Sequence, residues 1–101
     1  MNVAKLDITW DSAKSLSNIV KHGVTFAQAA AVLKDPLALT VFDSAHNEVE
    51  ERWFSLGMAD GKLLAVSHTY RATGPVSAQV RIISARPSTR SEREQYENEP
   101  R

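Results

Sequence analysis

The sequence predicts an α+β domain in which two N-terminal helices precede an antiparallel sheet and a short closing helix. Two helix-like segments with capping residues lie before residue 35, strand-like runs fill 37–86, and a charged segment with a capping signature follows Pro87. A chain of 101 residues has room for one core, so we expect a single domain, 1–101, with frayed ends at 1–6 and 97–101.

The N-terminal part alternates apolar and polar residues over 6–10, which predicts a short strand. Asp11 or Ser12 then caps a helix that runs to about His22, and Gly23 supplies its left-handed end. Apolar residues share one broad face of this helix, namely Ala13, Leu16, Ile19 and Val20. Polar residues share another, namely Lys14, Asn18 and Lys21.

A second helix is predicted from the capping box formed by Thr25 and Gln28. Its expected buried stripe contains Phe26, Ala29, Ala30 and Leu33. The segment ends before Pro36, because the residue that precedes a proline resists helical angles.

Four strand-like runs follow, at 37–42, 51–59, 62–71 and 79–86. Asp60-Gly61 suits a two-residue hairpin turn between the second and third runs, whereas 72–78 indicates a longer, looser connection. Thr89 and Glu92 form another capping box, which predicts a charged helix to Tyr96.

Composition limits the classes of function. The formal net charge is zero, which argues against gripping nucleic acid by bulk electrostatics. The chain has no cysteine, no apolar run long enough for a membrane helix and no signal-peptide pattern, so we expect a cytoplasmic protein without disulfides or thiolate metal sites. The segment from Arg52 to Arg90, however, contains six basic residues and one acidic residue, Asp60, so its net charge is +5. This basic centre suits a local anionic ligand, although arginines scattered over a solvated sheet would give the same pattern.

Two chemistries have little support. His22, His46 and His68 lack the close spacing of a zinc helix, so we expect no metal site and no cofactor. There is also no Gly-x-Ser-x-Gly elbow for a serine nucleophile, and four glycines do not make a phosphate-binding loop.

Metal-free cleavage of RNA fits the available side chains better. This reaction needs a base for the 2′-hydroxyl proton, cations for the phosphorane charge and an acid for the leaving oxygen. Candidates in and after the predicted sheet are Glu51, Arg52, His68, Arg71, Arg81, Arg86 and Tyr96. Structural interpretations compete with this one. Glu51 and Arg52 would form a cross-strand ion pair, His68 would be half-buried, and Tyr96 would dock the last helix.

Several spaced blocks resemble the BrnT family of type II toxins. They are WDSAKSLSNIVKHGVTF, DP, EERWFSLG, RIISAR and EREQY, and the similarity spans about Ile8 to Tyr96. The matching positions include Trp10, Asp11, Lys14, Asn18, Lys21, His22, Gly23, Val24, Phe26, Asp35, Pro36, Asp43, Glu51, Arg52, Gly57, Arg71, Glu92, Arg93 and Tyr96. The long connection at 72–78 is a departure at which substrate contacts would differ.

The resemblance implies a RelE-like fold and a ribonuclease that inhibits translation until an antitoxin neutralises it. The expected partner is a BrnA-like antitoxin with a ribbon-helix-helix DNA-binding dimer, through which alone the toxin would touch operator DNA. For the site, we expect Arg52, Arg71 and Arg86 to bind phosphate and either Glu51 or His22 to act as the base. Further RNA contacts are expected from Lys14, Lys21, Arg81 and Tyr96, with Tyr96 or Lys21 assisting the reaction.

Two rival interpretations remain open at this point. The sheet and its arginines would serve equally well in a non-catalytic module that docks an acidic, DNA-binding partner. A metal-dependent nuclease is the other alternative, which indifference of RNA cleavage to a chelator would exclude.

Overall fold

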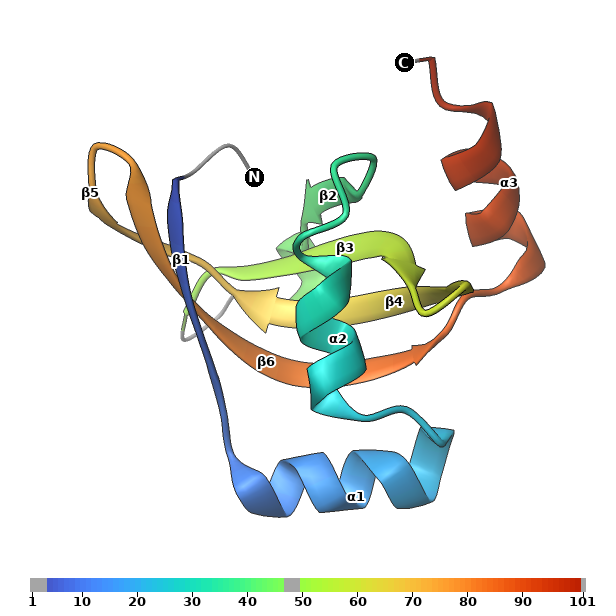
Figure 1. The fold of residues 1–101 in the computed structure, drawn as a ribbon, viewed down its shortest axis with the longest axis horizontal. Coiled ribbons are helices and arrows are strands. Elements are labelled where there is room, and N and C mark those ends of the chain that lie inside the picture. The colour runs from blue at the N-terminus through green and yellow to red at the C-terminus, as the bar shows by residue number, and fades with distance from the viewer. Residues whose placement is uncertain (1–3, 47–49, 101) are drawn as a thin grey trace.

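The fold was determined as a computed structural model, which describes residues 4–46 and 50–100. In this part of the chain three α-helices accompany a six-stranded sheet (Figure 1). The elements, in chain order, are β1 (Lys5–Trp10), α1 (Ser12–His22), α2 (Phe26–Val32), β2 (Leu39–Phe42), a 3₁₀ turn (Ser44–His46), β3 (Arg52–Ala59), β4 (Lys62–Thr69), β5 (Arg71–Gly74), β6 (Ser77–Pro87) and α3 (Arg90–Asn98). The predicted α+β class is confirmed.

The sheet is mixed, which corrects the expectation of a purely antiparallel one. Its order is β1-β6-β4-β3-β2, and β5 lies off this path, paired with the first residues of β6. β1 runs parallel to β6, from Lys5 beside Ser77 to Trp10 beside Ile82, whereas the other pairs are antiparallel. An alternating run has the same pattern in either direction, so the sequence could not indicate that β1 pairs in parallel with a strand some 70 residues away.

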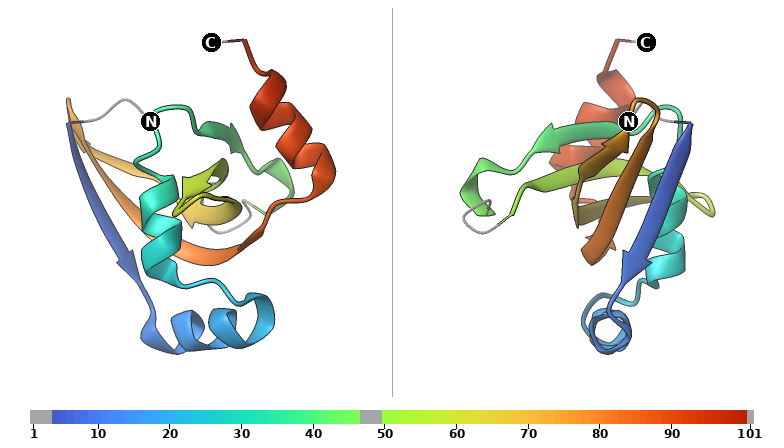
Figure 2. Two further views of the ribbon diagram at one scale, coloured as in Figure 1. Left: turned by 45° about the vertical axis from the view of Figure 1, so that its right-hand side comes forward. Right: turned by 90° about the vertical axis from the view of Figure 1, so that its left-hand side faces the viewer.

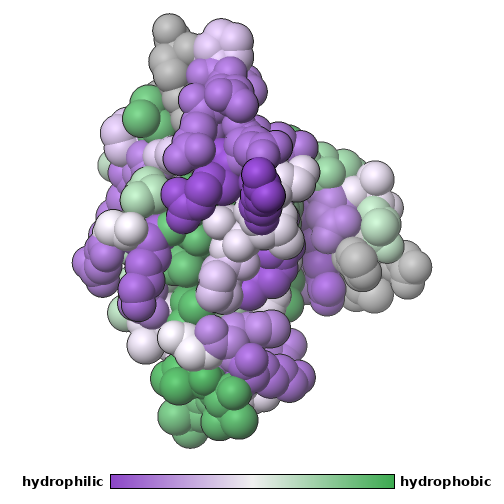
Figure 3. Space-filling view, turned by 90° about the vertical axis from the view of Figure 1, so that its right-hand side faces the viewer, coloured by the Kyte–Doolittle hydropathy of each residue, from purple (hydrophilic) through white to green (hydrophobic). Residues whose placement is uncertain are grey.

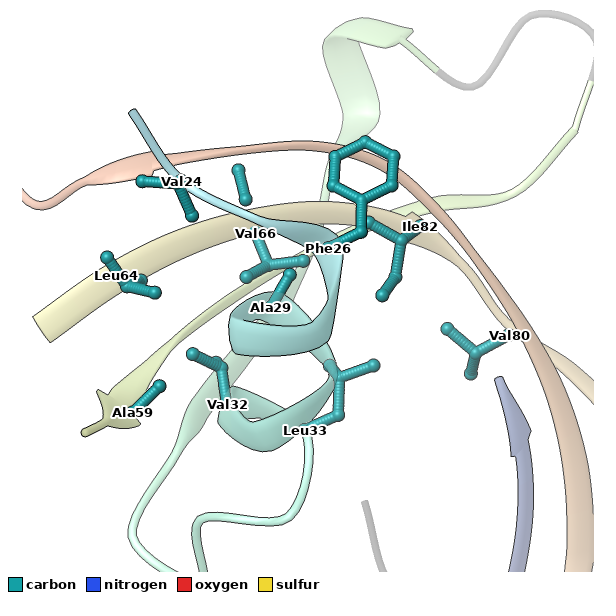
Figure 4. Close-up of a cluster of buried hydrophobic side chains, with 11 residues drawn as sticks. Val24, Phe26, Ala29, Val32, Leu33, Ala59, Leu64, Val66, Val80 and Ile82 are labelled. Atoms are coloured by element: carbon teal, nitrogen blue, oxygen red, sulfur yellow. The ribbon is translucent and has the colours of Figure 1, made fainter. Parts of the chain in front are cut away.

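The larger core lies between α2 and one face of the sheet. Phe26, Ala29 and Val32 of α2, with Leu33 directly after it, pack onto Leu64, Val66, Val80 and Ile82 of β4 and β6 (Figure 4). The Thr25 hydroxyl accepts from Gln28 N at 3.1 Å and the Gln28 side chain accepts from Thr25 N at 2.9 Å, so the predicted capping box is confirmed. We call the face of the sheet that α2 covers the helical face.

The opposite face of the sheet carries a smaller core beneath α3. Leu56, Leu63 and Ala65 are buried there, and Tyr96 of α3 packs against them. The two helices therefore lie on different sides of the sheet, as the two views in Figure 2 show. The capping box of Thr89 and Glu92 is confirmed, with hydrogen bonds of 2.8 and 3.1 Å. We call this second side of the sheet the open face, because α3 covers only part of it.

Helix α1 has the predicted ends but an unexpected orientation. Asp11 accepts from Lys14 N at 2.9 Å, and Gly23 adopts φ 67°. Amphipathic helices normally turn their apolar face to the core. Here the buried residue of the helix is Asn18, at 4% exposure, whereas Leu16 and Val20 are 67% and 88% exposed. The apolar side of α1 faces away from the protein.

The β3–β4 and β5–β6 hairpins form tight turns. Asp60 and Gly61 adopt φ angles of 51° and 75°, which confirms the predicted two-residue hairpin turn between β3 and β4. The expectation of a loose 72–78 connection is wrong, because β5 pairs with β6 and Gly74 lies opposite Ser77. The turn residues Pro75 and Val76 are not those typical of a two-residue hairpin turn, which is why the sequence pattern did not reveal the β5–β6 hairpin.

The elements at the two ends of the described chain lie partly within the segments that we expected to fray. β1 begins at Lys5 and α3 ends at Asn98, and fraying at 1–6 and 97–101 stays a prediction. Residues 1–3 and 101 lie outside the described part. No helix among the described residues is long and apolar enough to cross a membrane.

Candidate functional site

Strand register places arginines from different strands on the open face. Residues that pair directly across antiparallel strands point to the same side of a sheet. Arg52 pairs with Thr69, and Arg71 pairs with Gln79. Arg81 follows Gln79 by two residues and therefore points to the same side, opposite to the buried Ile82.

A bulge in β6 adds a fourth arginine to this face. Ser84 pairs with Ser67 and Ile82 pairs with His68, so Ile83 has no direct partner in β4. Such an extra residue reverses the alternation beyond it. Arg86 consequently pairs with Ala65 on the open face, although in a regular strand it would point away from the side that Arg81 occupies.

Part of the open face forms a cavity of about 700 Å³ at the end away from α3. Its lining comprises Thr9, Glu50, Glu51, Thr69, Tyr70, Arg71, Ala72, Gln79 and Arg81. Three predicted site residues, Glu51, Arg71 and Arg81, thus lie around one hollow, which we call the arginine cavity. They come from the segment before β3, from β5 and from β6.

Polar contacts position the two guanidinium groups of the arginine cavity. Arg71 donates to the side-chain oxygen of Gln79, and Arg81 pairs with the Glu50 carboxylate. The backbone N–H of Arg81 donates to the Thr69 hydroxyl at 2.9 Å. Two guanidiniums and two carboxylates therefore share this lining, and Arg81 already holds an oxyanion of the kind that a phosphate would present.

Arg86 is engaged at the other end of the open face. Its two terminal nitrogens bind the two Glu92 oxygens at 2.8 and 2.9 Å, and its guanidinium lies 5.8 Å from the centre of the Phe54 ring. This pairing lowers the pKa of Glu92 to about 2 and raises the pKa of Arg86. Arg86 and Arg52 share a face with the arginine cavity but do not belong to its lining.

His22 lies in a different hollow. A cavity of about 600 Å³ is lined by the end of α1, the β3–β4 turn and the start of α3, and its basic members are His22, Lys62, Arg90 and Arg93. The structure therefore does not bring His22 together with Glu51, Arg71 and Arg81. Lys14 and Lys21 are exposed on α1 and line neither cavity.

Tyr96 and His68 have clear structural contacts. The Tyr96 hydroxyl donates to Asp35 Oδ2 at 2.7 Å, which supports the interpretation that this residue docks α3. His68 is fully buried on the helical face, with Nε2 2.8 Å from the Ser55 hydroxyl and Nδ1 2.8 Å from the Thr69 carbonyl oxygen. Burial lowers the pKa of His68, so the neutral ring is part of the core.

Comparison with known families identifies the chain. Residues 10–92 match the family described as "Ribonuclease toxin, BrnT, of type II toxin-antitoxin system". The chain belongs to this family. A type II toxin acts together with an antitoxin, so membership implies such a partner for this toxin. No similar sequence was found among curated proteins.

The matched region of the toxin contains the whole lining of the arginine cavity except Thr9. Sequence reasoning did not single out several of these residues, namely Thr9, Glu50, Thr69, Tyr70 and Gln79. Gln79 reaches Arg71 only through the β5–β6 hairpin, and Thr9 reaches Arg81 only through the parallel pairing of β1. Glu50 is adjacent to Glu51, and the sequence alone does not distinguish which of these two carboxylates pairs with Arg81.

Among the described residues of the toxin, no three His, Cys, Asp or Glu side chains gather closely enough to hold a metal ion. The chemically active groups that the described structure does bring together around the arginine cavity are guanidiniums and carboxylates.

Proposed function

We propose that this toxin is an endoribonuclease that inhibits translation, and that it cleaves RNA at the arginine cavity by metal-free acid–base chemistry. One observation carries the proposal. The register of β5 and β6 aims Arg71 and Arg81 into one hollow on the uncovered part of the sheet, beside the exposed carboxylate of Glu51. Cations and a free base in one open hollow are the groups that this reaction requires.

In this mechanism Glu51 accepts the proton of a ribose 2′-hydroxyl, whose oxygen then attacks the adjacent phosphorus. The phosphorus–O5′ bond breaks, a 2′,3′-cyclic phosphate forms, and the O5′ atom takes a proton. Water in this open hollow is our candidate for the donor of that proton, because the Tyr70 ring packs on Trp53 and the larger core. Arg71 and Arg81 bind the non-bridging phosphate oxygens, where the forked guanidinium matches two acceptors at once.

The ion pair of Arg81 with Glu50 supports an anion-binding role for Arg81, because the guanidinium already binds a carboxylate. Both side chains are more than one third exposed, so the pair contributes little to folding and a phosphate can replace the carboxylate. Arg52 and Arg86 would extend the cationic track along the open face for neighbouring nucleotides. Lys14, Lys21 and Tyr96 remain proposed as outer RNA contacts.

Cleavage of RNA by the purified chain in EDTA tests this proposal. We expect the parent to cut and an Arg71→Ala/Arg81→Ala variant to lose at least about 100-fold in rate, because one oxyanion donor typically contributes on the order of 10²–10³. Lys34→Ala removes an exposed cation at the end of α2 and should leave the rate unchanged. Loss of the parent's activity in EDTA would contradict the metal-free mechanism.

The identity of the base needs a separate pair of variants. Glu51→Gln and His22→Gln each remove one candidate, and the two positions lie in different cavities. We expect Glu51→Gln to slow cleavage by about 10²–10⁴ and His22→Gln to change it little. The reverse result would move the reaction to the cavity at the end of α1.

We further propose that the antitoxin is a BrnA-like ribbon-helix-helix protein, that the toxin contacts operator DNA only through it, and that the pair acts in the cytoplasm. The zero net charge supports indirect contact with DNA, because a protein that binds a duplex directly usually displays a strong positive field.

A non-catalytic docking module is the second candidate, and the paired arginines favour it. Arg81 and Arg86 both bind carboxylates of their own chain, as they would bind the acidic residues of a partner. Growth separates the two functions. Expression of an active toxin alone should arrest growth, whereas a docking module should be harmless.

A further inference from the structure

The cavity beside His22 has a basic lining that the proposed reaction does not use. Its volume is about 600 Å³, and its titratable members are His22, Lys62, Arg90 and Arg93. No Asp or Glu belongs to the described lining, so with histidine counted as neutral Lys62, Arg90 and Arg93 give it a formal charge of +3. The arginine cavity, in contrast, contains two carboxylates. We call the cavity beside His22 the basic hollow.

Segments far apart in the sequence form the basic hollow. The end of α1 and the start of α2 contribute one part of its lining, the β3–β4 turn another, and the residues from Pro87 into α3 the third. Leu63 and Leu64 are buried, so an apolar part of the lining lies beside the charged part. Figure 3 looks at this side of the protein and shows a largely hydrophilic surface above a hydrophobic foot.

The cations of the basic hollow are only loosely engaged by their own chain. Arg90 lies 3.5 Å from Glu94 and Arg93 lies 3.6 Å from Glu97, in exposed pairs along α3. Lys62 forms no ion pair with a described residue. Exposed pairs of this kind contribute little to stability, so an anion that enters the hollow displaces only weak contacts.

Strand β4 connects the basic hollow with the arginine cavity. Leu63 lines the hollow and Thr69 lines the arginine cavity, and six residues of a strand span about 20 Å. Arg86, which Glu92 binds, lies between them on the open face, opposite Ala65 of the same strand. Figure 1 shows β4 and β6 running side by side towards the start of α3. Basic side chains therefore lie at both ends of β4 and between them.

We propose that the basic hollow binds a phosphodiester of the same RNA strand whose scissile phosphate occupies the arginine cavity. This inference rests on the proposed function, since it assigns a second contact to that substrate. An RNA strand carries a negative charge at every nucleotide, so it presents a phosphate to the hollow as soon as it is long enough to reach it. The volume suits a nucleotide, and the guanidinium forks of Arg90 and Arg93 match phosphate oxygens.

The distance between the two sites predicts a dependence on substrate length. At the 3.4 Å rise of a stacked strand, about 20 Å corresponds to about six nucleotides. A dinucleotide has one phosphodiester and fills the arginine cavity alone, whereas an RNA of about 12 nucleotides reaches both sites. We expect Arg90→Ala/Arg93→Ala to raise KM for the longer RNA by about 10-fold. Its kcat, and both constants for the dinucleotide, should equal those of the parent.

Lys5→Ala/Lys34→Ala is the matched control, because it also removes two exposed cations but neither residue lines the basic hollow or the arginine cavity. Binding is measured separately from cleavage, by fluorescence anisotropy with a labelled 2′-O-methyl RNA of the same length, which lacks the attacking hydroxyl. The dissociation constant should rise about 10-fold for the Arg90→Ala/Arg93→Ala variant and stay at the parent value for the control. Both variants should keep the melting temperature of the parent.

The outcomes separate this inference from the proposed function. Equal RNA affinity of the two variants overturns the role of the basic hollow, and the ribonuclease function stands if the parent still cleaves RNA. A parent that cleaves neither substrate overturns the ribonuclease function, whereas the anisotropy comparison still decides whether the hollow binds RNA. Unchanged RNA affinity together with weaker binding of the antitoxin would assign the hollow to the protein partner and overturn the proposal.

Discussion

Asn18 and Ala85 are joined by two hydrogen bonds. The side-chain amide of Asn18, on α1, pairs with the backbone of β6 in the way that the backbone of a neighbouring strand would. Nδ2 donates to Ala85 O at 2.8 Å, and Ala85 N donates to Oδ1 at 3.0 Å. Ala85 immediately precedes Arg86 and follows the bulge at Ile83. Asn18 therefore supports the irregular part of β6 as well as the orientation of α1.

Asn18→Ala should destabilise the toxin strongly. The change leaves Ala85 N, Ala85 O and Val24 O without their side-chain partner in a buried place, and each such group costs about 1–3 kcal/mol. We expect the free energy of unfolding in urea to fall by about 3 kcal/mol. Ser17→Ala, at the neighbouring exposed position, should change it by less than about 0.5 kcal/mol. Equal unfolding curves for the two variants would show that α1 is not held by this amide.

Tyr96→Phe should loosen the attachment of α3 without removing its aromatic contact. The ring still packs on Leu56, Leu63 and Ala65, but Asp35 Oδ2 loses the hydroxyl donor at 2.7 Å. A hydrogen bond to a charged group contributes about 1.5–3 kcal/mol, so we expect a loss near the lower value at this partly buried site. Urea denaturation measures the loss, with Gln95→Ala on the exposed side of α3 as the control. An unchanged midpoint would exclude Asp35 as an anchor for the helix.

The pair of Arg86 and Glu92 should make stability depend on acidity. Hydrogen bonds from Arg86 hold the pKa of Glu92 at about 2, below its usual 4.5. Since the folded pKa is the lower one, the unfolded chain binds more protons between these values, and stability falls as the pH drops from about 4.5 towards 2. Glu92→Gln should flatten the pH profile of the unfolding free energy in this window. Glu97→Gln, at a more distant ion pair of 3.6 Å, should not.

The parts of the fold that were predicted correctly depend on short-range hydrogen bonding. Thr25 and Thr89 cap their helices through residues three positions later, and Gly23 and Asp60-Gly61 adopt the positive φ angles that their types allow. Such rules involve neighbours in the sequence, so a single chain displays them directly.

The features that were missed depend on distant contacts. Neither the parallel pairing of β1 nor the bulge at Ile83 leaves a local pattern, yet the bulge decides which face Arg86 occupies. For the candidate site, the residue types were predicted but not their grouping. Glu51, Arg71 and Arg81 meet in one cavity, whereas His22 lies in another, because hairpin register rather than sequence spacing sets their positions.

His68 should remain neutral through the whole physiological range. Its Nδ1 faces the Thr69 carbonyl oxygen, which can only accept, so the proton must lie on Nδ1, and Nε2 accepts from the Ser55 hydroxyl. Ser55 in turn lies 2.8 Å from the Thr40 hydroxyl, which is left to act as its donor. Nuclear magnetic resonance of the ring nitrogens should show a single Nδ1–H tautomer that does not titrate near pH 6.5.

Burial of His68 also predicts the sign of a second pH effect. The folded pKa lies below the unfolded value of 6.5, so the unfolded chain takes up a proton first as the pH falls. The stability linked to this residue is thus complete above about pH 6.5 and declines below it. His22→Gln, which removes an exposed histidine, should preserve that decline in the unfolding free energy between pH 7.5 and 5.5. A His68 ring that titrates near pH 6.5 in the folded toxin would show instead that the Thr40–Ser55–His68 chain opens to water.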